Sequence, residues 1–192
     1  MKLTQATGIL ADLQMNFDDG WTPLTASEMT AIWPVIQDCL GTRAGDLTKI
    51  KIAEQPLSFI PGARFFRLRQ RRGMGQTTRY MIQLANGVSL AVHYSPRIID
   101  ELREQQALQV TDAVLGDYIA FYWRFTAHGR PARIIDHDQN LATQQTSKGI
   151  LATGDWHEHG QSMPLEAIIA ADGHITFTAD DMSLDAPPRH LQ

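Results

Sequence analysis

Residues 64–94 read RFFRLRQRRGMGQTTRYMIQLANGVSLAVHY, and this stretch determines the fold class. Phe65–Arg71 and Thr77–Ala85 are rich in strand-forming residues and flank a glycine-containing loop, so they predict a hairpin. Asn86-Gly87 follows, and this dipeptide favours a tight turn because both of its residues tolerate positive φ. The sequence therefore predicts three consecutive antiparallel strands, of which Val88–Tyr94 is the last.

The Asn86-Gly87 turn also predicts a register. If the loop has two residues, Ala85 pairs with Val88 and Tyr80 lies opposite His93. The two faces of this hairpin are then formed by Met81, Leu90 and Val92 and by Ile82, Leu84 and Ala91. Because both faces are partly apolar, we expect other elements to cover the sheet on both sides.

Helices are expected before and after these strands in the chain. Thr25-Ala26-Ser27-Glu28 has capping-box spacing, and apolar residues continue from it at helical spacing as far as Gly41. Pro34 lies inside this pattern and is expected to kink or divide the helix. Ser95-Pro96 opens a second helix, with Ser as the cap and Pro at the first helical position.

The segment Tyr118–Ala127 fits two periodicities. Its aromatic content and its alternating apolar residues predict a strand, which is the interpretation we adopt. The spacing of Val114, Tyr118, Phe121 and Phe125 also fits a helix that would end near Gly129. The polar stretch that follows, Asp136–Lys148, is expected to be a loop.

A further hairpin is predicted near the C-terminus, where Leu165–Ala170 and His174–Thr178 flank Asp172-Gly173. Its core face is expected to hold Ile168, Ile175 and Phe177. Together these elements predict an α+β fold with a mainly antiparallel sheet and two or three packing helices. A closed or half-open β-barrel is the alternative, and we expect one domain over residues 1–192 with a loose tail at 185–192.

Composition narrows the protein class. Cys39 is the only cysteine, so neither an intrachain disulfide nor a multi-cysteine zinc site is expected. No stretch approaches the ~18 apolar residues that a membrane span needs, and the N-terminus lacks a signal-peptide pattern. We therefore expect a cytoplasmic protein without membrane contact. Exposed edge strands are compatible with homodimerisation.

Arginines dominate the charge of the first predicted hairpin. Between Arg64 and Arg79 there are six arginines and no acidic residue. In a strand, Arg67, Arg69 and Arg71 project from one face, and their guanidinium groups match carboxylate and phosphate oxygens. Arg79 belongs to the same hairpin, and the sequence predicts an anion site formed by these residues.

The ligand of such a site is expected to be a small anion or an acidic protein surface. Nucleic acid is disfavoured because the chain has a net charge of −4 and carries no recognised nucleic-acid motif. The alternative is a solvated face that pairs with the acidic part of the same chain, since residues 137–192 sum to −6 (eight acidic residues, Lys148 and Arg189).

A second candidate site depends on the strand predicted at Tyr118–Ala127. On a strand, one face holds a polar row next to aromatic residues, formed by Tyr122, Arg124, Thr126 and His128. Such a row could line a ligand pocket, with Arg124 orienting a substrate and His128 or His93 moving a proton. The alternatives are an outward sheet face for the row and a cross-strand contact with Tyr80 for His93.

The remaining motifs are weak. His157 and His159 point the same way if their segment is extended, so they are candidate metal ligands, and an exposed polar loop is the alternative. No Walker, nucleophile-elbow or dinucleotide motif occurs, and no cofactor is indicated.

The sequence therefore predicts a binding or interaction module that holds an anionic ligand or acidic partner. A small enzyme acting on a carboxylate or phosphate substrate is the alternative.

Overall fold

The computed structural model describes residues 20–72, 75–128, 141–158 and 161–177. They fall into two compact units: the first contains residues 20–72 and 75–128, and the second contains the remaining described residues. Within these ranges each unit has an antiparallel sheet, and three α-helices belong to the first unit. The predicted α+β class with mainly antiparallel sheets is therefore confirmed.

The expectation of a single domain stays a prediction, and limited proteolysis between the two units would test it. The predicted tail at 185–192 lies outside the described residues. In both sheets the strand order is linear, so among the described residues neither sheet closes into the barrel that was the alternative.

The first unit contains a five-stranded sheet with the order β1-β2-β3-β4-β5, in which every neighbouring pair is antiparallel. Its strands are β1 (Thr22–Pro23), β2 (Ile50–Pro56), β3 (Arg64–Arg72), β4 (Gly75–Gln83) and β5 (Ser89–Val92). Its helices are α2 (Ala26–Leu40), α3 (Arg97–Glu104) and α4 (Leu115–Tyr122). Shorter helical segments are η1 (Gly41–Ala44), η2 (Leu47–Lys49), η3 (Asp112–Val114) and the π-helix η4 (Trp123–His128).

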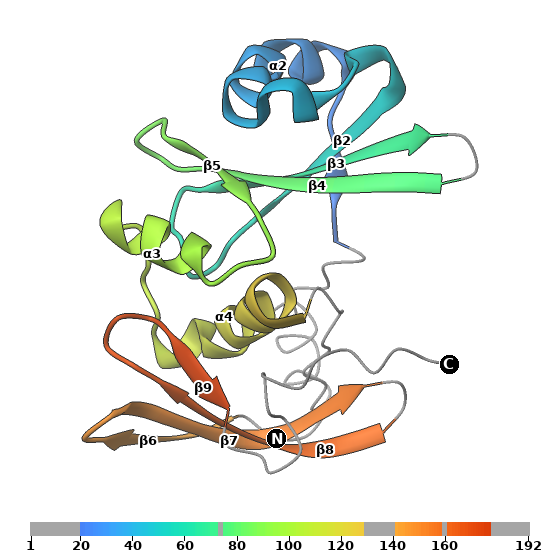
Figure 1. Ribbon diagram of the computed structural model, residues 1–192. Helices are drawn as coiled ribbons and strands as arrows, with labels where there is room; N and C mark the ends of the chain where they lie inside the picture. The colour runs from blue at the N-terminus through green and yellow to red at the C-terminus, as the bar shows by residue number, and fades with distance from the viewer. Residues whose placement is uncertain (1–19, 73–74, 129–140, 159–160, 178–192) are drawn as a thin grey trace, which may run out of the picture. The chain divides into compact units, whose positions relative to one another are not determined.

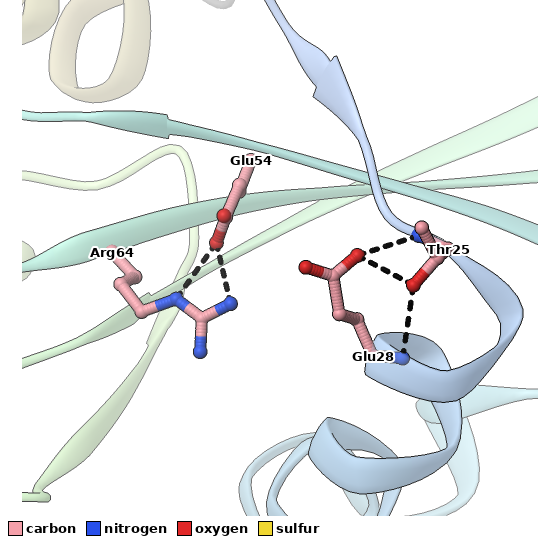
Figure 2. Close-up of polar contacts among 4 residues, drawn as sticks. All are labelled: Thr25, Glu28, Glu54 and Arg64. Atoms are coloured by element: carbon pink, nitrogen blue, oxygen red, sulfur yellow. Dashed lines mark hydrogen bonds and ion pairs between the residues drawn. The ribbon is translucent and has the colours of Figure 1, made fainter.

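Helix α2 begins with the predicted capping box (Figure 2). The Thr25 hydroxyl accepts a hydrogen bond from the Glu28 backbone N–H at 3.3 Å, and the Thr25 backbone N–H donates to the Glu28 carboxylate at 2.7 Å. These bonds satisfy donors that every helix N-terminus leaves unpaired. The helix runs undivided through Pro34 and ends at Leu40, and the φ of 55° at the next residue, Gly41, suits a residue without a side chain.

One face of the sheet packs against α2, and we call it the α2 face (Figure 1). Ile32, Ile36 and Leu40 of the helix are buried together with sheet residues. The sheet contributes Ile50, Ile52, Phe66, Leu68 and Met81. Burial of each of these large side chains stabilises the fold by about 1.5–3 kcal/mol, so this layer fixes the sheet on the helix.

The opposite face of the sheet carries the side chains of Phe65, Arg67, Arg69 and Arg71, and we call it the arginine face. Aromatic rings of α4 and η4 cover one end of it. The Phe65 ring lies 5.9 Å from that of Phe121 and 5.5 Å from that of Phe125. Figure 1 shows α2 and α4 on opposite sides of the sheet, so the expectation that both faces are covered is confirmed.

The turn between β4 and β5 differs from the prediction by one residue. The Leu84 N–H donates to the Val88 carbonyl, so the loop has three residues and ends in Gly87 at a φ of 87°. Asn-Gly suits this longer loop equally well, because its last residue also needs positive φ. The predicted register was therefore wrong: Tyr80 pairs with Val92 and not with His93.

The one-residue shift moves side chains to the other face of the sheet. Met81 pairs with Ala91, so these two residues share the α2 face. Leu90 and Val92, which were predicted to lie beside Met81, share the arginine face with Ile82.

The strand predicted at Tyr118–Ala127 was wrong, because this segment is helical in α4 and η4. Every residue from 117 to 126 is buried. A segment that is buried on all sides places apolar residues at both the helical and the strand period, so alternation could not distinguish the two. On a helix, residues two apart lie on roughly opposite sides, so the predicted polar row does not exist.

The second unit is a four-stranded antiparallel sheet with the order β6-β7-β8-β9 (orange to red in Figure 1). Its strands are β6 (Ala142–Thr146), β7 (Gly149–Glu158), β8 (Gln161–Ile169) and β9 (Ile175–Phe177). Strand β6 lies within the stretch 136–148 that was predicted to be a loop.

The predicted hairpin at Asp172-Gly173 is present, again with a three-residue loop. The Ala170 N–H donates to the His174 carbonyl, and Gly173 has a φ of 85°. Ile169 therefore pairs with Ile175 and is buried, while Ile168 lies on the other face. The placement of Ile168 on the core face was wrong for the same reason as the register of the first hairpin.

No helix in the described part of the chain combines the length and the apolar character that crossing a membrane requires.

Candidate functional site

The predicted clustering of arginines on one strand face is confirmed by the β3 register. Arg67, Arg69 and Arg71 alternate along β3 and point from the arginine face. Lys51 of β2 is paired with Arg69 and adds a fourth cation to this face. Their exposure increases toward the β3–β4 hairpin, since Arg67 is buried, Arg69 is half-buried and Arg71 is exposed.

Polar residues of β4 lie beside these cations. Tyr80, Thr78 and Gln76 are the partners of Arg67, Arg69 and Arg71, in that order. Gln76 and Thr78 are at least partly exposed. Their amide and hydroxyl groups offer hydrogen bonds beside the guanidinium groups, so the open end of the arginine face can hold an anion by charge and by hydrogen bonding.

Trp21 fixes the position of the innermost arginine. The guanidinium carbon of Arg67 lies 4.5 Å from the centre of the Trp21 ring, within range of a cation–π interaction. The same ring lies 5.2 Å from that of Phe65 and 6.0 Å from that of Tyr80. Arg67 is thus held over a packed aromatic cluster, which reduces the conformational freedom that a ligand would otherwise have to restrict.

The two faces of β3 differ in how their charges are compensated. On the α2 face, Arg64 Nη2 lies 2.6 Å from Glu54 Oε2, and Nε donates to the same oxygen at 2.7 Å (Figure 2). On the arginine face, no described strand position holds an Asp or a Glu. Arg69 and Arg71 make no ion pair with any residue that the structure describes.

Arg79, the fourth arginine of the predicted site, lies elsewhere. It pairs with Leu68 and therefore lies on the α2 face, away from Arg67, Arg69 and Arg71. Tyr122 is buried in α4 with its ring against that of Tyr118 at 6.3 Å. Neither residue joins the open end of the arginine face.

An exposed tyrosine lies beside the arginine face, and sequence analysis did not identify it. Tyr94 follows β5 and is 54 % exposed, with its ring stacked on Phe125 at 5.9 Å. Partial burial raises the pKa of its phenol, as does the neighbouring Tyr80, whereas the charge of Arg124 acts in the opposite direction. Arg124 is itself buried in η4.

The candidate catalytic residues are not brought together as far as the structure describes them. His93 is exposed and lies near η1, where Arg43 Nη1 can donate to its Nε2 at 3.3 Å. Val92 points from the arginine face, so the next residue, His93, points toward the α2 face. Arg124, in contrast, belongs to the η4 segment that covers the arginine face. The side chain of His128 lies outside the described residues. The enzymatic alternative stays a prediction.

The structure describes the candidate metal ligands only in part. His157 belongs to β7, where it pairs with Ser162, but its side chain and the whole of His159 lie outside the described residues. Among the residues whose positions are described, no group of three or more His, Cys, Asp or Glu could hold a metal ion.

Burial lowers the reactivity expected of the Cys39 thiol. It is half-buried in α2, where burial raises the pKa of its thiol, so the nucleophilic thiolate is disfavoured at neutral pH.

Comparison of the chain with protein-family models, with curated proteins and with solved structures finds no match.

Proposed function

We propose that this protein is a binding module that holds an anion on the open end of its arginine face. The observation that carries the proposal is the contrast within β3. Arg64 on the α2 face has a carboxylate partner, whereas Arg69 and Arg71 have none among the described residues. Uncompensated like charges destabilise a folded protein unless something else neutralises them, and a bound anion would do so.

The geometry supports a ligand with several oxygen atoms. Arg69 and Arg71 are two residues apart on one strand, so their side chains project in parallel and can grip the same group. Arginine forms paired hydrogen bonds with carboxylate or phosphate, and charge-assisted bonds of this kind are stronger than neutral ones. Both a phosphorylated small molecule and an acidic protein surface offer such oxygens.

The test uses two double variants of matched size and charge. Arg69→Glu/Arg71→Glu reverses one half-buried and one exposed arginine on the arginine face. Arg79→Glu/Arg103→Glu reverses one half-buried arginine on the α2 face and one exposed arginine in α3. Both variants change the net charge equally, so any difference between them reports on the location of the charges and not on the total.

Calorimetric titration with sodium pyrophosphate, and separately with a hexaglutamate peptide, measures the affinity of each variant. We expect the reversal on the arginine face to weaken binding of at least one of the two compounds by about tenfold or more, because charge-assisted hydrogen bonds are lost. The control pair should remain close to the wild type. Equal affinities in both double variants, or no binding by the wild type at millimolar concentration, would refute the proposal.

The same titrations separate the two ligand classes. Preferential binding of pyrophosphate favours a small phosphorylated ligand, and preferential binding of hexaglutamate favours an acidic protein partner. Homodimerisation and a cytoplasmic location also stay predictions, which sedimentation of the purified protein and imaging of the tagged chain would test.

A further inference from the structure

The large aromatic side chain of Tyr94 is exposed to solvent. Of the large hydrophobic side chains that the structure describes, it is the only exposed one, with 54 % of its surface accessible. An aromatic ring left in water forgoes the stabilisation that its burial would give. Its exposed surface is therefore available for contact with a ligand.

The position of the Tyr94 ring is fixed from one side. Its plane lies at 21° to that of Phe125, which is itself fully buried. Phe125 in turn contacts the Tyr80 ring at 4.9 Å. One face of Tyr94 thus rests on the aromatic cluster of the first unit, and the accessible surface belongs to its other face and its edge.

Packing through Phe125 places Tyr94 near Tyr80, the cross-strand partner of Arg67. Val92 pairs with Tyr80, and Tyr80 pairs with Arg67. The pairing of β5 ends at Val92, and Tyr94 follows it with its ring on Phe125, which contacts the Tyr80 ring. Tyr94 therefore lies near the Tyr80–Arg67 pair, and Arg69 is the next residue toward the β3–β4 hairpin on the same face of β3.

We propose that the ligand of the arginine face is a nucleotide, whose phosphate groups bind Arg69 and Arg71 and whose planar base stacks on the accessible face of Tyr94. This inference rests on the proposed anion site and adds the ring to it. A sugar joins phosphate and base in such a ligand, and Thr78, the partner of Arg69, offers it a hydroxyl for a hydrogen bond. Bases stack readily on exposed aromatic side chains, as proteins that bind single nucleic-acid strands show.

The alternative of a nucleic-acid polymer is less favourable. The chain has a net charge of −4, and four basic residues lie at the strand positions of the arginine face that the structure describes. A polymer binds through many phosphate contacts along an extended basic surface. One ring platform beside one compact group of cations suits a single nucleotide.

The experiment compares adenosine diphosphate with inorganic pyrophosphate, which carries the same two phosphate groups without the base. We expect the wild-type full-length chain to bind adenosine diphosphate about tenfold more tightly than pyrophosphate. Tyr94→Ala should abolish this preference while leaving the affinity for pyrophosphate unchanged. Tyr94→Leu tests the same point with the apolar contact to Phe125 retained, and Tyr94→Phe should keep the preference.

The outcomes distinguish this inference from the anion site on which it rests. If both compounds bind equally, or if the Tyr94→Ala and Tyr94→Leu proteins keep the preference, the base does not stack on Tyr94 and the inference is wrong. If at the same time Arg69→Glu/Arg71→Glu still weakens both compounds, the anion site stands without the ring. If that double variant binds both compounds like the wild type, the anion site itself is refuted.

Discussion

The two faces of strand β3 are built from alternating residues of one short sequence, yet they differ in the fate of their charges. On the α2 face, Phe66 and Leu68 enter the core and Arg64 is paired with Glu54. On the arginine face, Arg69 and Arg71 have no acidic partner among the described residues. The fold accounts for the charge of Arg64, whereas the proposed anion site would account for the charges of Arg69 and Arg71.

The largest expected effect concerns stability, to which the two faces should contribute differently. Phe66→Ala removes a fully buried ring from the α2 face, so we expect a loss of about 3–5 kcal/mol in the free energy of unfolding. Arg69→Ala, three residues away on the arginine face, should change it by less than about 0.5 kcal/mol. Urea denaturation followed by tryptophan fluorescence measures both values. Similar losses in the two variants would show that the arginine face also stabilises the fold.

The alternation that separates the two faces was predictable from the sequence. Side chains in a strand alternate with a period of two, so Arg67, Arg69 and Arg71 had to share a face once β3 was identified. The placement of Arg79 was not predictable in the same way. It depends on which residue of β3 it pairs with, and the pairing follows from the β3–β4 hairpin as a whole.

Both wrong registers have one physical origin. Asn-Gly and Asp-Gly were interpreted as two-residue loops, but in each hairpin the loop has three residues with glycine at positive φ in the last position. The dipeptide identifies the turn and leaves its length open. Because the strand period is two, an error of one residue exchanged the faces assigned to Ile168 and to Ala91.

Two site residues could not be found from local patterns. Trp21 and Tyr94 lie far apart in the chain and reach the arginine face only through tertiary packing, on Arg67 in one case and on Phe125 in the other. The helix that carries Phe125 was itself predicted to be a strand, so the contact had no basis in the predicted fold. Their roles depend on long-range contacts that sequence spacing does not encode.

Removing one charge from each face of the sheet should have a smaller effect on stability, and the two results can be compared directly. Glu54→Gln leaves Arg64 without its partner, so we expect the free energy of unfolding to fall by up to about 1 kcal/mol. Arg69→Gln relieves repulsion from Lys51, Arg67 and Arg71, so it should leave stability unchanged or raise it slightly. Both changes should shrink in high salt, which screens exposed charges. A clear loss of stability in Arg69→Gln would reveal an acidic partner for this face within the chain.

The smallest expected effect is a change in the pH dependence of stability. It concerns Glu28, whose carboxylate is paired within the capping box of α2. Hydrogen bonds from Thr25 lower the pKa of the Glu28 carboxyl below its usual value of 4.5. A group whose pKa is lower in the folded state contributes stability above its unfolded pKa and loses that contribution as the pH falls through the folded value. Glu28→Gln should therefore lose less stability than the wild type between about pH 5 and about pH 3. Thermal unfolding across this range measures it, and parallel curves would contradict the assigned hydrogen bonds.

The most direct test of the proposed anion site is to observe the arginine side chains during a titration with pyrophosphate. The Nε–Hε resonances of the arginines are measured by nuclear magnetic resonance on nitrogen-labelled protein and assigned by single substitutions. We expect the signals of Arg69 and Arg71 to shift as pyrophosphate is added, while those of Arg64 and Arg79 on the α2 face stay in place. Equal shifts on both faces, or none on the arginine face, would contradict the proposed anion site.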